Sequence, residues 1–173
     1  MRRILLIATL LLTALTASAQ DALLERLKAA NTFETLQLSF VQTRHSAMLT
    51  EDLTSEGRLV IAAPDRIRWE VLKPYRSVFT SSGELSVAGR RFRIPTEKDF
   101  TVTVLEGEDV SLKLLPLRRD LKQLLREVIV HADKNTLRIR SALLISPDGD
   151  WTRLEFKDIR VNQPVDDQLF EKE

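Results

Sequence analysis

The stretch Arg66-Ile67-Arg68-Trp69-Glu70-Val71 decides the fold class of this chain. Apolar and charged residues alternate strictly along it. Because successive side chains of a β-strand point to opposite faces, this pattern predicts a strand with one apolar and one polar face. Pro74 ends the strand, and Pro64-Asp65 before it is typical of a turn. We expect the three apolar side chains, Trp69 among them, to face the interior.

The same period of two recurs along most of the chain. It predicts strands around Leu36–Phe40, Leu59–Ile61, Ser77–Ser81, Glu84–Ala88, Arg91–Ile94, Phe100–Val104, Val110–Leu114, Glu127–Ala132, Leu137–Ile145 and Trp151–Ile159. Helical spacing appears only at Asp21–Asn31 and, more weakly, at Leu117–Arg126. Short turns, such as Pro147-Asp148-Gly149-Asp150, separate the strands. The sequence therefore predicts a mainly β fold, a single curled antiparallel sheet with one N-terminal helix and one short further helix.

The first nineteen residues have the layout of a secretory signal peptide. Arg2 and Arg3 precede the apolar run Ile4–Leu15, and Ala17-Ser18-Ala19 forms a small-residue cleavage site. The alternative, a retained membrane anchor, is disfavoured because the run is short and no second apolar run follows it. We expect cleavage after Ala19, a periplasmic location in a bacterium, and one mature domain over residues 20–173.

Composition narrows the function classes. The full chain has 26 basic and 25 acidic residues, so that loss of the two arginines of the leader leaves a formal charge of −1. A near-neutral balance argues against general nucleic-acid binding. The chain has no cysteine, so neither disulfides nor lipidation of a cysteine can stabilise or anchor it, and its stability must come from an apolar core.

Groups suited to catalysis are sparse, and we expect no enzyme activity, no cofactor and no metal. His45 and His131 are the only histidines and lack the spacing of a zinc motif. Neither a GxSxG elbow nor a glycine-rich phosphate loop occurs. Carboxylates could in principle act in pairs, but Glu106, Glu108 and Asp109 fall in a turn that reads as a solvated loop tip.

The candidate site consists of the apolar residues that alternate with polar ones along the predicted strands. These residues are expected to point inward, and taken alone such a set more often builds an ordinary core than a ligand cavity. They are Leu38, Phe40, Leu59, Ile61, Ile67, Trp69, Val71, Leu85, Val87, Phe92, Val102, Val104, Leu112, Leu114, Leu154 and Phe156.

Arginines occupy the opposite phase of two of the predicted strands. Arg66 and Arg68 flank Ile67, and Arg91 and Arg93 flank Phe92. They could form a positive strip for an acidic ligand or membrane surface. The alternative is the solvated outer face of a sheet, with the arginines paired to nearby carboxylates.

Several short motifs, in this order and spacing, resemble the LolA family of periplasmic lipoprotein carriers over nearly the whole mature chain. The early ones are Phe40-Val41-Gln42, Gly57-Arg58-Leu59, Ala63-Pro64, Arg68-Trp69-Glu70, Lys73-Pro74 and Ser82-Gly83-Glu84. The later ones are Leu114-Leu115-Pro116, Gly149-Asp150-Trp151-Thr152, Phe156, Val161-Asn162 and Leu169-Phe170.

The resemblance implies an incomplete β-barrel whose concave side binds acyl chains without a cofactor. The inward residues named above would then line a lipid-binding cavity. The cargo would be an acylated lipoprotein or another lipid-like molecule, and the protein a monomer. An inner-membrane transporter would deliver the cargo and an outer-membrane acceptor would receive it.

Two departures from the family pattern bear on the cavity. Ala63 stands where family members have an arginine that helps to hold the lid closed, and the short link from Ile94 to Phe100 leaves no room for the lid helices. We therefore expect either a filled barrel or an open groove that binds an acyl chain without large helix movement, and favour the groove on the family's precedent. A filled barrel would make the chain a protein-interaction module, the second hypothesis; an enzyme that uses exposed carboxylates is the third.

Overall fold

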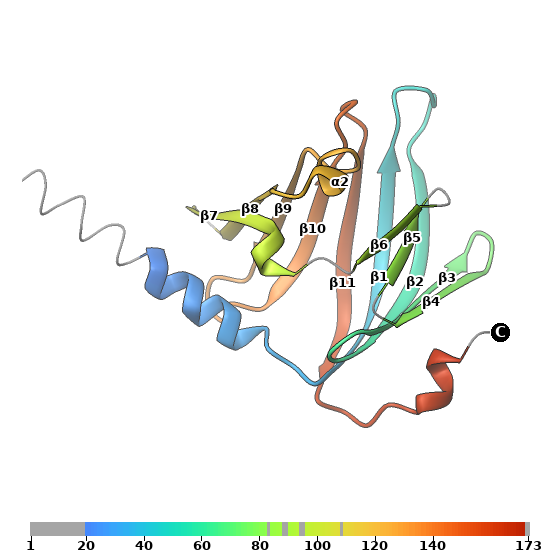
Figure 1. Ribbon diagram of the computed structural model, residues 1–173, viewed down its shortest axis with the longest axis horizontal. Coiled ribbons are helices and arrows are strands. Elements are labelled where there is room, and N and C mark those ends of the chain that lie inside the picture. Colours follow the sequence, from blue (N-terminus) through green and yellow to red (C-terminus); the bar gives the residue numbers. More distant parts are fainter. Residues whose placement is uncertain (1–19, 83, 88–89, 94–95, 108, 172–173) are drawn as a thin grey trace, which may run out of the picture.

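The computed structural model describes residues 20–82, 84–87, 90–93, 96–107 and 109–171 (Figure 1). Its main element is a nine-stranded sheet with the strand order β4-β3-β2-β1-β11-β10-β9-β8-β7. Neighbouring strands are antiparallel throughout. The strands of this sheet are β1 (Thr35–His45), β2 (Leu53–Ala62), β3 (Arg66–Lys73), β4 (Ser77–Ser82), β7 (Phe100–Glu106), β8 (Val110–Pro116), β9 (Glu127–Ala132), β10 (Ile139–Ile145) and β11 (Trp151–Val161).

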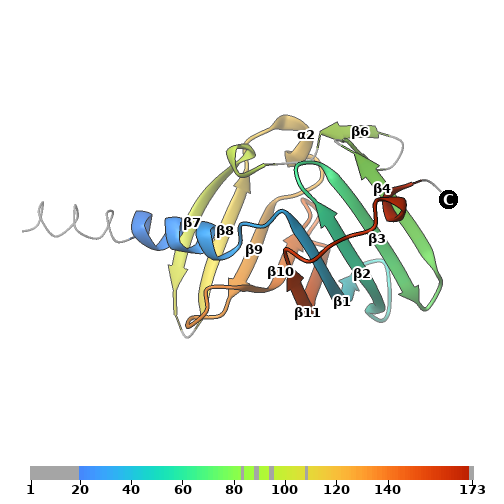
Figure 2. The ribbon, with the colours of Figure 1, turned by 90° about the horizontal axis from the view of Figure 1, so that it is seen from below.

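The sheet curls without closing, which confirms the predicted fold class. β4 and β7 are its two edges and do not pair with each other. Figure 2 shows the curl, with helix α2 (Arg119–Lys122) and a small second sheet lying across its opening. That second sheet consists of β5 (Glu84–Val87) and β6 (Arg90–Arg93).

Helical structure is short. The N-terminal helix covers residues 20–30, close to the predicted range, and α2 is only the middle of the segment predicted as the second helix. Between β6 and β7 the described residues hold a single 3-10 turn, η1 (Glu97–Asp99). A second 3-10 turn, η2 (Asp167–Phe170), follows β11. None of the helices in the described ranges is both long and apolar enough to span a membrane.

Strand register sorts the side chains onto two faces, because directly opposed residues of antiparallel strands point the same way. Leu38 opposes Leu59, Leu59 opposes Trp69, and Trp69 opposes Phe79. On the other half, Val102 opposes Leu114, which in turn opposes Val128. These residues form part of the apolar side of the sheet, which we call the inner face.

The outer face of β3 holds the segment that follows β11. Arg66 Nη1 lies 2.6 Å from Asp167 Oδ1, and its guanidinium lies 4.9 Å from the Phe170 ring centroid. Arg68, which is buried, donates a hydrogen bond of 2.9 Å to the Leu169 carbonyl oxygen. These contacts favour the paired outer face over the positive strip. The side chains of Arg91 and Arg93 lie outside the described residues.

Candidate functional site

The inner face brings together the predicted inward residues of the nine-stranded sheet. Each of them opposes another apolar inner-face residue in the register of at least one neighbouring strand, except Val71, which opposes Gly57 and Ser77. Leu85, Val87 and Phe92 belong instead to the separate β5–β6 sheet, where Leu85 opposes Phe92. The orientation of these three side chains lies outside the described residues.

Sequence reasoning missed several residues of the same face. Alternation within Glu127–Ala132 and Ser77–Ser81 could have identified some of them, whereas β10 is apolar in both phases and gives no such signal. The missed residues include Leu36, Phe79, Val110, Val128, Val130, Ala132, Ile139, Ala142, Leu144, Ile159 and Val161.

A β-bulge explains two of these omissions. Lys157 opposes Ser39 and Arg160 opposes Gln37, so that β11 has one more residue than β1 between these pairs. The extra residue is Asp158, whose φ of 52° is left-handed. Simple alternation from Phe156 would turn Asp158 and Arg160 inward. The bulge reverses the phase, and Ile159 and Val161 line the inner hollow instead.

The N-terminal helix covers one end of the inner face. Leu27, which is 2% exposed, packs in a buried cluster with Val104, Val110, Ala132 and Leu137. Leu23, Leu24 and Ala30 pack against the same cluster from the helix. This spacing places one apolar side of the helix on the sheet.

Asn31 fastens the end of this helix to the sheet. Its Nδ2 atom donates 2.8 Å hydrogen bonds to the carbonyl oxygens of Leu27 and Leu137. Its Oδ1 atom accepts a 3.0 Å hydrogen bond from the Ile139 backbone N–H. The side-chain amide thus donates two hydrogen bonds and accepts one. These bonds fix the end of the helix to the sheet.

A second apolar core lies on β1–β3. The rings of Phe40 and Trp69 have centroids 4.1 Å apart, and Phe40 is only 1% exposed. Phe40 lies over Gly57, where an added Cβ would stand 2.4 Å from the ring and 2.2 Å from the Glu70 carbonyl oxygen. The close approach requires glycine at this position, which gives a physical reason for the Gly57-Arg58-Leu59 motif.

Two hollows flank the end of the helix on the inner face. One, of about 150 Å³, has a mainly apolar lining that includes Leu36, Leu59, Phe156, Ile159 and Val161. The other, of about 290 Å³, lies beside Leu24, Leu27 and Leu112. Asn31 and Ile139 border both. Pockets for drug-sized ligands hold roughly 300–1,000 Å³, so neither hollow alone is large.

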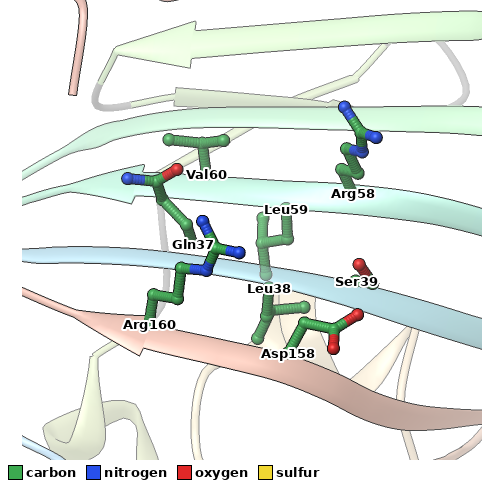
Figure 3. A pocket seen from close by; sticks show the side chains of 8 residues that line it. All are labelled: Gln37, Leu38, Ser39, Arg58, Leu59, Val60, Asp158 and Arg160. Atoms are coloured by element: carbon green, nitrogen blue, oxygen red, sulfur yellow. The ribbon is translucent and has the colours of Figure 1, made fainter. Parts of the chain in front are cut away.

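A third hollow, of about 330 Å³, lies on β11, β1 and β2 with a mostly polar lining (Figure 3). The side chains of Gln37, Arg58 and Arg160 border it, on the phase opposite to Leu38 and Leu59. Its character differs from that of the inner hollows, because the charged side chains of Arg58, Asp158 and Arg160 belong to its lining.

The displaced pKa values of the described carboxyl groups share one direction. Within the described ranges, every carboxyl group with a displaced pKa has it lowered, as for Glu127, whose pKa is lowered mainly by a hydrogen bond from Lys113. A catalytic acid would need the opposite shift. In the same ranges no group of three or more potential metal ligands comes together. His131 lies 2.9 Å from the Ser111 hydroxyl, on the outer face.

An open, curled antiparallel sheet with an apolar inner face and a helix against one end defines the LolA-like fold, and comparison with known proteins agrees. Residues 31–92 match the family described as outer membrane lipoprotein carrier protein LolA. The LolA superfamily protein NE2245 from Nitrosomonas europaea has a similar structure, with a TM-score of 0.50 and 10% identity, over 88% of this chain and 97% of that chain. The fold of the chain is therefore LolA-like.

The fold is also similar to that seen in the MucA/MucB complex of Pseudomonas aeruginosa. The TM-score is 0.52 and the identity 18%, over 89% of this chain and 61% of that chain. A structure of MucB gives the same TM-score at 16% identity, with 63% of that chain covered. This chain thus spans about three fifths of the length of MucB. No curated protein sequence matches it.

Proposed function

We propose that this chain is an exported, non-catalytic carrier or binder of acylated cargo, a lipoprotein or another lipid-like molecule. The observation that carries the proposal is the part of the inner face that the N-terminal helix does not cover, where Leu59, Phe156 and Ile159 surround an apolar hollow while remaining half-buried. Each methylene group of a cargo chain that leaves water for such a surface contributes about 0.8 kcal/mol. The LolA-like fold and the family match support the same function.

The signal-peptide pattern of residues 1–19 supports export to the periplasm. Transfer would then need a donor at the inner membrane and an acceptor at the outer membrane, as the LolA resemblance implies.

A protein-interaction module is the second candidate. It is favoured by the similarity to the MucA/MucB complex, in which MucB is bound to MucA, and by the small size of the inner hollows. In that case the inner face would be core, and a partner protein would bind elsewhere on the chain.

Titration with a fluorescent fatty acid tests the proposal with a matched pair of variants. Leu59 and Val60 are neighbours on β2, both half-buried, but they point to opposite faces. Leu59→Asp puts a carboxylate on the inner face and should weaken probe binding by roughly tenfold or more. Val60→Asp should leave binding within about twofold of the wild type.

Circular dichroism checks that both variants fold. Saturable binding by the wild type that only Leu59→Asp weakens supports the carrier. If the wild type binds no acylated probe, or if the two variants weaken binding equally, the interaction module becomes the better description.

A further inference from the structure

The hairpin that joins β1 to β2 ends in exposed apolar side chains. Met48 is 94% exposed, Leu53 is 55% exposed and Leu49 is 45% exposed. We call these three residues the hairpin tip. Figure 1 shows the hairpin projecting beyond the turn between β3 and β4. Large apolar side chains gathered at a projecting point of a folded domain indicate a contact surface.

Hydrogen bonds hold the tip in this exposed position. The Leu49 N–H donates to the Ser46 carbonyl oxygen at 3.0 Å, and the Ala47 N–H donates to Asp150 Oδ1 at 3.0 Å. The buried Ser46 also holds the pKa of the Asp150 carboxyl below its usual range through a side-chain hydrogen bond. Because these hydrogen bonds attach the loop to the neighbouring hairpin, Met48 is exposed on an ordered loop.

Aromatic packing supports the base of the tip. The His45 ring stacks on Trp151 with centroids 5.3 Å apart and planes 10° apart. On the other side of the hairpin, His45 Nδ1 lies 2.7 Å from Asp52 Oδ1. The hairpin is thus braced by residues of β1, β11 and its own loop.

Other apolar side chains lie at the same end of the sheet. Antiparallel order places the β1–β2 and β3–β4 turns at one end, and Tyr75 in the second turn is 84% exposed. Leu117, after β8, is also exposed at this end. The N-terminal helix packs at the opposite end, beside the start of β8 and the end of β9 (Figure 1).

The shape and charge of this end point to its partner. None of the three hollows described above is lined by Met48, Leu49 or Tyr75, so the apolar groups stand on projecting loops. A bilayer interface can accommodate projecting apolar side chains without a complementary pocket, and leucine and tyrosine are favoured there. Acidic Glu51 and Asp148 lie in this loop and the neighbouring one, and basic Lys73 and Arg76 beside Tyr75 pair with Glu56 and Glu70. This arrangement argues against attraction to anionic lipid.

We propose that the hairpin tip docks onto the zwitterionic surface of a lipid bilayer by insertion of Met48 and Leu49. Leu53 shares the strand phase of Gly57 and Leu59, so the tip stands at one end of the inner face. A docked chain would bring that end of the inner face close to the membrane. The docking rests on the tip alone and does not require that the inner face bind an acyl chain.

The absence of cysteine from the sequence allows a direct test. Met48→Cys carries an environment-sensitive fluorophore, and Leu105→Cys is the matched control. Leu105 has the same 45% exposure as Leu49 but lies on β7, towards the end of the sheet that holds the helix. With phosphatidylcholine vesicles, the emission at position 48 should shift to the blue while that at position 105 stays unchanged.

A second arm measures co-sedimentation of the unlabelled protein with the same vesicles. Met48→Ser combined with Leu49→Ser should reduce vesicle binding by roughly tenfold or more, because two apolar side chains no longer insert. Fatty-acid probe binding without vesicles should stay at the wild-type level in this variant, which separates docking from the proposed function.

Three outcomes would overturn the docking. They are no binding of the wild type to phosphatidylcholine vesicles, equal emission shifts at positions 48 and 105, and binding that appears only when phosphatidylglycerol is added and vanishes in salt. The last result would assign the contact to charge instead of the apolar tip.

Discussion

Two parts of the inner face share the same alternating apolar pattern but differ in what covers them. At the β7–β10 end, Leu27 of the N-terminal helix closes over Val104 and Ala132, and all three are buried. On β11, β2 and β3, the side chains of Phe156, Leu59 and Trp69 remain half-buried. The difference indicates that alternation selects a face, whereas a covering element decides how deeply the side chains of that face are buried.

Asn31 stands at the boundary between the two parts. It fixes the helix to Leu137 and Ile139 and borders both inner hollows. Because Asn31 and Ile139 border both hollows, we expect movement of the helix end to join them into a longer apolar groove. The covered part therefore supplies stability, and under the proposed function the other part supplies the binding surface, with Asn31 at the boundary between them.

Removal of the central helix contact should have the largest effect. Leu27→Ala takes a side chain that is 2% exposed out of the cluster and should lower the free energy of unfolding by about 3 kcal/mol. Urea denaturation measures the change. Arg26→Ala, an exposed position on the same helix, should change it by less than about 0.5 kcal/mol. A loss below about 1 kcal/mol for Leu27→Ala would mean that the helix is not an integral part of the core.

Much of the sheet could be predicted from sequence, because alternation is a local signal. The pattern around Trp69 correctly identified β3, and the predicted inward residues of the nine-stranded sheet share one face. The phase of β11 beyond Phe156 could not be predicted, because the bulge at Asp158 depends on its pairing with β1. The alternation of one strand does not indicate whether it has an extra residue relative to its pairing partner.

Long-range contacts were beyond the reach of sequence patterns. Helical spacing correctly indicated the N-terminal helix. The hydrogen bond from Asn31 to the Leu137 carbonyl oxygen, 106 residues away, could not be predicted from a local pattern. For the same reason, alternation could not tell which inward residues the helix would bury. The separation of β5–β6 from the main sheet also depends on tertiary packing and was not predicted.

Removal of the Asn31 side chain, which attaches the end of the helix to the sheet, should have an intermediate effect on stability. It also tests whether this attachment limits the half-buried part of the inner face. Asn31→Ala leaves the Leu137 carbonyl and the Ile139 N–H without their side-chain partner and should lower the free energy of unfolding by about 1–2 kcal/mol. Because the two hollows could then join, fatty-acid probe affinity should rise.

Thr32→Ala is the matched control for this variant. It removes a 2.8 Å hydrogen bond from Thr32 Oγ1 to the Lys28 carbonyl oxygen, which lies within the helix itself. It should leave probe affinity unchanged. An equal rise in both variants, or none in Asn31→Ala, would show that the attachment of the helix to the sheet does not limit the binding surface.

The smallest expected effect is a loss of stability at low pH in the loop that contains Asp133, which packs beneath the helix. Hydrogen bonds from the Thr136 backbone and hydroxyl, and from the Asn135 backbone, hold the pKa of the Asp133 carboxyl below its usual range. This loop positions Leu137, whose side chain is buried in the helix-covered cluster. A carboxyl group with a lowered folded-state pKa stabilises the fold above its unfolded pKa of about 3.9, and this contribution is lost as the pH falls through the lower folded value.

Amide hydrogen exchange of the helix, followed from about pH 5 down to about pH 2, should therefore show earlier loss of protection than the β1–β2 pair after correction for the intrinsic pH dependence of exchange. Asp133→Asn cannot ionise but keeps an acceptor oxygen, so its helix protection should depend less steeply on pH. Thermal unfolding of both proteins over the same range provides an independent measure. Identical pH profiles would mean that ionised Asp133 does not support the covered part of the inner face, and that its boundary is set by apolar packing and Asn31 alone.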